Sequence, residues 1–156
     1  MTAMPAPSTR PGIAAPVRRL VAALDRIPDS VLALAARVFP AAVFWQSGQT
    51  KLEGWSISDS AILLFREDYR LPLIDPVVAA HLAAVAEHVL PILLVLGLGA
   101  RFAALGLLGM IAVIQVFVYP DAWPTHGVWA ASLLLVAARG AGVLSLDHLL
   151  FARHRG

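Results

Sequence analysis

Long runs of apolar residues, separated by short polar stretches, dominate the sequence. Four runs, at about residues 31–48, 76–97, 101–119 and 127–146, each approach the roughly 20 residues that an α-helix needs to cross a hydrocarbon core of about 30 Å. The pattern therefore predicts an all-α, polytopic membrane protein whose four transmembrane helices form a bundle.

Before the first run, apolar positions recur with helical spacing instead. Val17, Leu20, Val21, Leu24 and Ile27 alternate with Arg18, Arg19, Asp25 and Arg26. This predicts a short amphipathic helix, which either lies on an anionic membrane surface or is a solvated basic lead-in to the first span. Residues 1–16 are rich in Pro, Ala, Ser and Thr and are expected to be disordered; a cleaved mitochondrial presequence is a further alternative.

The connection between the first two runs is long. Within it, residues 58–69 carry an apolar centre at 61–65 flanked by charges, which predicts a short interfacial helix. Pro72 and Pro76 follow, and because each proline disfavours helix in the residue before it, the second span is expected to begin there.

Arginine and lysine are distributed unevenly between the two sides that four spans define. One side receives Arg10, Arg18, Arg19, Arg26, Arg101, Arg139, Arg153 and Arg155, and the other only Lys51, Arg66 and Arg70. The positive-inside rule makes the first side cytoplasmic. We therefore expect a cytoplasmic tail with the amphipathic helix (1–29), a four-helix transmembrane domain (30–150) and a cytoplasmic C-terminal tail (151–156).

Composition excludes several classes of function. The chain is 59% hydrophobic and 14% charged, which is outside the usual balance of a soluble domain. Its net charge is only +2 and its basic residues are scattered along the chain, so no basic stripe is available for binding nucleic acid. Cysteine is absent, which removes thiolate nucleophiles, iron–sulfur clusters and cysteine zinc sites. A redox role would need a bound cofactor or a partner.

Two charges fall inside predicted spans. Glu87 lies about eleven residues into the second span and Arg37 six or seven into the first. Because a charge in hydrocarbon is costly without a partner, we expect an intramembrane ion pair, either structural or linked to a proton or ligand. His81 and His88 share a helix face, but no His and carboxylate spacing argues for a metal, so we predict none.

Polar side chains from all four predicted spans share one depth near the outer surface. They are Gln46, Lys51, His81, Gln115 and His126, with Trp45 and Trp123 beside them. An apolar pocket with a few hydrogen-bond donors would suit a quinone head group, so these residues form a candidate ligand site. The alternative is an ordinary interfacial belt of aromatic and polar residues.

Several short segments resemble, in order, motifs of the DoxX family of bacterial membrane proteins. They are FWQSGQTKL at 44–52, YRLPL at 69–73 with Glu87 beyond it, LGLGAR at 96–101, YPDAW at 119–123 with His126, and GVLSLD at 142–147. In that family the corresponding motif positions are Gly48, Lys51, Glu87, Arg101 and Asp147.

The resemblance implies a multi-pass protein of the bacterial inner (plasma) membrane. Some family members are membrane subunits of a thiosulfate:quinone oxidoreductase, and others are linked to a complex with superoxide dismutase and a sulfurtransferase. We therefore expect a membrane subunit of a redox or quinone-linked complex, with quinone as the candidate cofactor and other subunits or further copies of the chain as partners. The alternative is a non-enzymatic carrier or a helper that binds another membrane protein. Without a nucleotide loop or a Ser-His-Asp set, the chain is not expected to be a self-contained enzyme.

Overall fold

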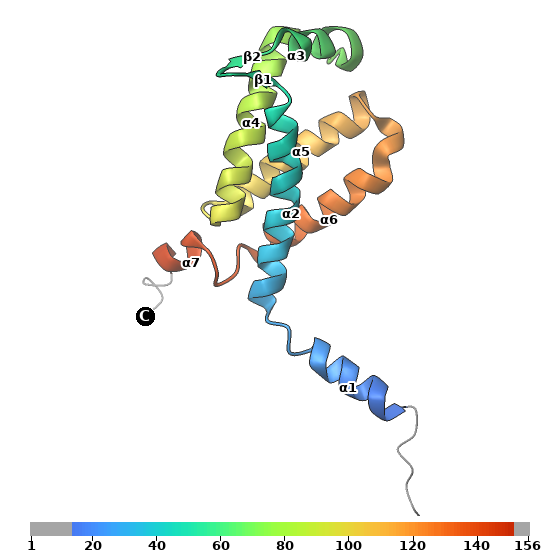
Figure 1. Cartoon of the computed structure of the whole chain (residues 1–156), viewed down its shortest axis with the longest axis vertical. Coiled ribbons are helices and arrows are strands. Elements are labelled where there is room, and N and C mark those ends of the chain that lie inside the picture. Colours follow the sequence, from blue (N-terminus) through green and yellow to red (C-terminus); the bar gives the residue numbers. More distant parts are fainter. Residues whose placement is uncertain (1–13, 152–156) are drawn as a thin grey trace, which may run out of the picture.

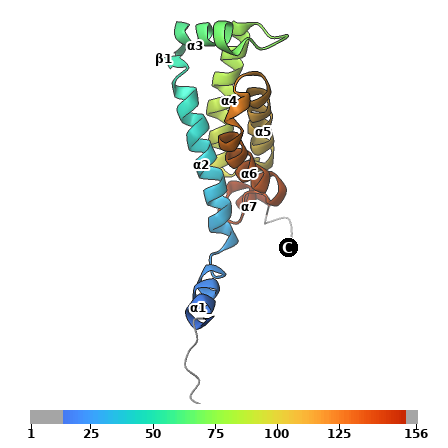
Figure 2. The same cartoon turned by 90° about the vertical axis from the view of Figure 1, so that its right-hand side faces the viewer.

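A computed structural model describes residues 14–151, and its main feature is a set of four long helices. They are α2 (Asp29–Gln49), α4 (Pro76–Leu96), α5 (Ala100–Phe117) and α6 (Trp123–Arg139). Helix α2 packs on α4 and α6, and α5 packs on α4 and α6, which closes the bundle seen in Figures 1 and 2.

The two ends of the bundle carry different short elements. One end, called the hairpin end, holds the antiparallel strands β1 (Leu52–Glu53) and β2 (Ser56–Ile57), helix α3 (Asp59–Leu64), the π-helical turn η1 (Phe65–Tyr69) and the 3₁₀ turn η2 (Pro120–Ala122). The other, called the terminal end, holds α1 (Ala14–Leu24) and α7 (Leu146–Phe151). Figure 1 shows these two groups at opposite ends.

Helices α2, α4 and α5 are each long and apolar enough to cross a membrane. Large apolar side chains on their outer faces stay exposed in the isolated chain, among them Val85, Ile92 and Val116. In water such a surface would be unfavourable, whereas lipid covers it at no cost. The chain is therefore a membrane protein whose helices contact lipid.

The predicted first three spans agree with α2, α4 and α5 to within two residues at each end. The fourth was placed wrongly, because α6 begins at Trp123 and ends at Arg139 instead of covering residues 127–146. Gly140 and Gly142 have φ of 86° and 76°, a backbone conformation that stops a right-handed helix. The apolar residues beyond them belong to a loop and to α7.

The helix predicted within residues 58–69 is present as α3 followed by η1. Ser58 begins it, since its hydroxyl accepts a hydrogen bond from the amide of Ala61 at 3.2 Å, as an N-cap residue does. The hairpin that precedes it was not predicted. Helix α1 covers Ala14–Leu24, and the prediction that this segment is an amphipathic helix on a membrane surface stays a prediction. The tail at 1–13 and residues 152–156 lie outside the described part of the chain.

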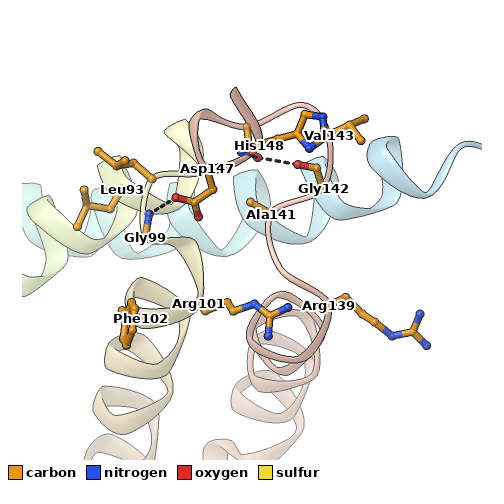
Figure 3. A pocket seen from close by; sticks show the side chains of 12 residues that line it. Leu93, Gly99, Arg101, Phe102, Arg139, Ala141, Gly142, Val143, Asp147 and His148 are labelled. Atoms are coloured by element: carbon orange, nitrogen blue, oxygen red, sulfur yellow. Dashed lines mark hydrogen bonds between the residues drawn. The ribbon is translucent and has the colours of Figure 1, made fainter. Parts of the chain in front are cut away.

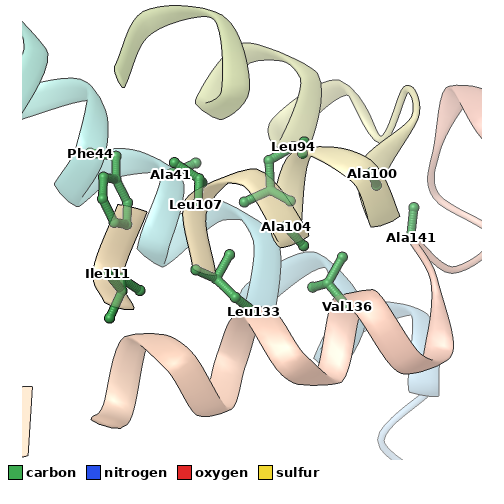
Figure 4. Close-up of a cluster of buried hydrophobic side chains, with 11 residues drawn as sticks. Ala41, Phe44, Leu94, Ala100, Ala104, Leu107, Ile111, Leu133, Val136 and Ala141 are labelled. Atoms are coloured by element: carbon green, nitrogen blue, oxygen red, sulfur yellow. The ribbon is translucent and has the colours of Figure 1, made fainter. Parts of the chain in front are cut away.

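The core between α2, α4, α5 and α6 combines alanines with larger apolar side chains (Figure 4). Ala41, Ala100 and Ala104 are almost fully buried, and Leu107 and Leu133 fill the space between them. Small residues let helix backbones approach closely, which is how helices associate in lipid without a hydrophobic driving force. This packing fixes α2 against α4, where the candidate site is found.

Candidate functional site

Lys51 and Glu87 form an ion pair at the point where α2 ends. Lys51 Nζ lies 2.6 Å from Glu87 Oε2, and the two side chains are 5% and 3% exposed. Helix α2 stops at Gln49, and the chain turns so that the amide of Lys51 donates to the carbonyl of Gly48 at 3.0 Å. That turn directs the lysine side chain back along the helix towards α4.

Ser47 connects the two charges. Its hydroxyl donates to Glu87 Oε1 at 3.1 Å, and Lys51 Nζ donates to the Ser47 hydroxyl at 3.2 Å and carbonyl at 3.3 Å. Beyond its contact with Lys51, Glu87 Oε2 has no hydrogen-bond partner in the described residues. A carboxylate can accept about four hydrogen bonds, so this one retains capacity for a further donor.

Close approach of the two helices makes the pair possible. A Cβ atom on Gly48 would lie 2.7 Å from His88 Cε1, which is closer than real Cβ atoms come to another heavy atom, and 3.1 Å from Glu87 Cβ, which is a tight contact. The His88 ring is itself held by Ala84 O at 2.6 Å, by Gln49 Nε2 at 2.8 Å and by the ring of Trp45. Glycine at 48 therefore sets the separation that the Lys51–Glu87 contact requires.

The predicted ion pair between Arg37 and Glu87 is wrong. Helices α2 and α4 are antiparallel, and Glu87 lies level with Gly48 at the hairpin end of α2. Eleven residues of helix separate Arg37 from Gly48, or about 16 Å at the helical rise, so the arginine cannot reach the carboxylate. The prediction counted the depth of Glu87 from the outer end of its span and that of Arg37 from the cytoplasmic end. It treated the two helices as spanning the same interval, whereas α4 extends beyond α2 at the hairpin end (Figure 1).

Arg37 instead contacts backbone carbonyls at the terminal end through Nη1 and Nη2, while its buried Nε has no hydrogen-bond partner among the described residues. Its Nη1 donates to the carbonyls of Leu94 and Val95 at 3.3 and 3.2 Å, and its Nη2 donates to that of Leu144 at 2.6 Å. The first two carbonyls lie in the last turn of α4, where the helix dipole favours a cation. This explains how a fully buried guanidinium persists without a carboxylate beside it.

A cavity of about 390 Å³ lies beside the Lys51–Glu87 pair and is called the hairpin-end cavity. Its walls come from α2, α4, α5 and α6, and η1 and the segment after it contribute further lining. The lining is mainly apolar, with Phe44, Ala79, Ala83, Met110, Val113, Ile114 and Trp129 among its members. Against this background the polar groups are few, namely Ser47, Lys51, Glu87, His126, Tyr69 and Tyr119.

Aromatic rings close the cavity next to η1. The rings of Tyr69 and Tyr119 are 5.9 Å apart, and that of Phe65 is 4.8 Å from Tyr69. Burial raises the pKa of Tyr69 well above its ordinary value, and neighbouring Tyr119 raises it further. The Tyr69 phenol is thus a protonated hydrogen-bond donor at any physiological pH.

The structure brings together only part of the predicted ligand set. Lys51 and His126 line the cavity, and Gln115 Oε1 accepts a hydrogen bond from His126 Nδ1 at 2.7 Å. His126 is buried and stacks near Trp129 with ring centroids 5.4 Å apart. These residues come from α5 and α6 as well as the end of α2.

Five members of the predicted set do not line the hairpin-end cavity, and one of them, Gln115, is linked to it only through His126. Trp45 is partly exposed against His88, Gln46 is exposed, and Trp123 is 69% exposed. His81 is exposed, and its Nδ1 bonds to the carbonyl of Val77 on its own helix at 2.7 Å. The predicted residues were grouped because they share one depth near the outer surface. Depth alone does not show whether a side chain faces the interior of the bundle or its outside. Within residues 14–151, no group of three His, Asp or Glu side chains could hold a metal ion.

Sequence reasoning missed Ser47, Tyr69, Tyr119 and Trp129. Ser47 carried a usable signal, because it stands four residues before Lys51, a spacing that places two side chains on one helical face. Nothing in the sequence pointed to Tyr69 and Tyr119, because the contact between their rings depends on how η1 and the segment after α5 fold over the bundle.

A bundle with apolar outer faces, a buried ion pair and a cavity between its helices defines a multi-helix membrane protein with a small internal site. The DoxX family model matches residues 32–120, and the chain belongs to that family. It is also 31% identical over 136 residues to an uncharacterized protein of Haemophilus influenzae strain Rd, covering 81% of this chain and 88% of the relative. No solved structure matches.

Proposed function

We propose that the chain binds the head group of a lipid-soluble quinone in the hairpin-end cavity, as the membrane subunit of a redox or quinone-linked complex. The single observation that supports this most is the buried Lys51–Glu87 pair in the wall of a mainly apolar cavity between the helices. Ligand sites of this kind combine apolar walls with a few placed polar groups.

The chemistry of the lining matches that of a quinone. Its ring carbonyls need hydrogen-bond donors. The Tyr69 hydroxyl can supply one, and Lys51 Nζ can supply another in exchange for one of its two contacts with Ser47 at 3.2 and 3.3 Å. Phe44, Trp129 and Met110 offer apolar contact to the ring. Glu87 and Lys51 also place one negative and one positive charge in the wall beside the head group. The chain's own part is to bind and orient the head group, and electron transfer falls to partner subunits.

Equilibrium binding of a short-chain quinone to the purified protein in mild detergent tests this proposal. Ala83→Leu fills part of the cavity and should lower affinity about ten-fold or more, the equivalent of about 1.4 kcal/mol. Lys51→Met should weaken binding several-fold through a lost donor. His81→Ala is the matched control on α4, because its side chain does not line the cavity.

Absence of binding by the wild-type protein, or an equal loss in His81→Ala, would contradict the proposal. Melting temperatures of all variants separate lost binding from lost folding. Mild-detergent purification then distinguishes the two function classes: co-purification of a redox protein supports the subunit role, and saturable binding without such a partner supports a carrier.

A further inference from the structure

A second and larger cavity opens at the terminal end of the bundle, and the proposed quinone site does not use it. It has a volume of about 1110 Å³ and is called the terminal-end groove. Figure 3 shows its walls at the start of α5, the end of α6 and the segment leading to α7. Leu93, Leu98, Phe102 and Val143 line it with apolar surface, and Phe102 is 82% exposed.

Two arginines line the same groove without an acidic partner. Neither Arg101 nor Arg139 makes an ion pair within the described residues. Arg101 crosses from α5 to the end of α6, where a Cβ on Gly140 would be 3.4 Å from its Nε, and Arg139 points away from α5 (Figure 3). The arginines therefore carry two positive charges next to apolar surface.

One carboxylate, that of Asp147, lines the groove together with the two arginines, so positive charge is in excess there. Asp147 uses both carboxylate oxygens at the start of α5, accepting from the amides of Gly99 at 2.8 Å and Ala100 at 3.1 Å. Asp29 lines a smaller cavity next to Arg139 but makes no ion pair with it. The exposed ring of His148 also borders the groove and adds no negative charge.

The level of the groove indicates what kind of molecule fits it. It lies where α4 ends, α5 begins and α6 ends, which is where lipid head groups meet a membrane-spanning bundle. Arginine binds phosphate through paired N–H donors, and basic pockets between helices recognise anionic head groups. An occupant must therefore have an anionic phosphate next to an apolar chain.

We propose that the terminal-end groove binds one anionic phospholipid, with its phosphate at Arg101, the positive charge of Arg139 at the edge of the groove, and an acyl chain along Leu93, Phe102 and Val143. The residues that carry this site are separate from those of the hairpin-end cavity, so the proposal stands or falls independently of quinone binding.

Native mass spectrometry in mild detergent tests it, using phosphatidylglycerol and phosphatidylcholine with identical acyl chains. The wild-type protein should retain phosphatidylglycerol preferentially. Each arginine near an anionic head group contributes about five-fold in affinity, so Arg139→Gln should reduce the preference and the Arg101→Gln/Arg139→Gln double variant should abolish it. Arg101→Lys keeps the charge and should retain most of the preference.

The matched control is Arg66→Gln/Arg70→Gln, which removes the same charge from exposed residues at the hairpin end. It should leave the preference unchanged. Equal retention of the two lipids by the wild type, or an equal loss in the control, would overturn the proposal. Complete displacement by millimolar inorganic phosphate would also overturn it, since a free anion would then be the ligand. Arg139→Gln removes an exposed side chain and keeps the test valid if Arg101→Gln fails to fold.

Discussion

Lys51 and Glu87 illustrate why buried charges in a membrane protein come in pairs. Both are almost completely shielded, and their contact at 2.6 Å is supported by Ser47. Taking either charge out of water alone would be costly, whereas the pair shares that cost and leaves no net charge. Lys51 lies two residues beyond the end of α2, so its role could not be read from the apolar run alone.

A double-mutant cycle measures the coupling between these two residues. Lys51→Met and Glu87→Gln should each lower stability, with Lys51→Met near the ~3–5 kcal/mol seen when one partner of a buried pair is removed. The double variant should lose much less than the sum of the single changes. Melting in detergent gives the values, and Arg70→Gln at an exposed pair 3.9 Å from Glu67 serves as control. Additive losses would show that the two side chains do not interact.

Two glycines on helices make a matched test of the close approach between α2 and α4. Gly48→Ala places a Cβ against the fixed ring of His88 and should cost about 1–3 kcal/mol through overpacking. Gly109→Ala meets no atom within 4 Å, so helix propensity should leave stability unchanged or raise it by up to about 1 kcal/mol. Equal melting temperatures for the two variants would mean that Gly48 does not set the helix separation.

At the scale of elements, apolar run length predicted α2, α4 and α5 well because each is limited by lipid thickness and by clear breaks. Pro76 begins α4, and Asp75 caps it by accepting from the amides of Val77 and Val78 at 2.9 and 3.2 Å. The end of α6 was missed because the residues after Gly140 stay apolar. Which side chains on two helices meet depends on how far one helix extends past its neighbour. The pattern of apolar residues along the sequence does not contain that offset.

Arg37 joins three elements at the terminal end. It holds the last carbonyls of α4 and the carbonyl of Leu144, before α7, to α2. Gly97, with φ of 68°, leaves room for it, since a Cβ there would collide with Arg37 Nη1 and with Ser145. The same region is reinforced by the amide of Asp147, which donates to the carbonyl of Gly97 at 2.9 Å.

Replacing Arg37 should therefore release the segment before α7. Arg37→Met leaves three carbonyls without this donor and should cost about 3 kcal/mol or more. Arg37→Lys should not restore stability, because one ammonium cannot span carbonyls on two segments as a guanidinium does. Hydrogen exchange should accelerate in residues 140–151 and remain unchanged at the hairpin end. Unchanged exchange in 140–151, or acceleration matched by Arg139→Gln, would contradict this role.

At the scale of the whole molecule, motifs that are far apart in the sequence meet at two places. Gly48, Lys51 and Glu87 gather at the hairpin end, while Gly97 and Asp147 meet at the terminal end. The chain begins and ends its described part at one end of the bundle (Figure 1), which fits an even number of crossings. Helix α6 has 17 residues, about 26 Å at the helical rise, which is at the short limit for a span.

The expected topology has four crossings, with the terminal end in the cytoplasm. Reporter fusions after Asp68 and Asp121 should report the outer side, and fusions after Gly99 and Gly156 the cytoplasm. The basis is the excess of arginine in the N-terminal segment, at Arg101 and at Arg139. A C-terminal fusion that reports outside would mean that α6 does not cross the membrane or that the orientation is inverted.

The most direct test of quinone binding in the hairpin-end cavity uses Trp129, which lines it. In a variant with Trp45, Trp55 and Trp123 changed to Phe, Trp129 is the sole tryptophan. A short-chain quinone should quench its fluorescence saturably, and Ala83→Leu should abolish the saturable part. A matched variant that keeps only Trp55, fully exposed beside the hairpin turn, should show only linear collisional quenching. Linear quenching of Trp129, or saturable quenching unaffected by Ala83→Leu, would contradict a quinone site in this cavity.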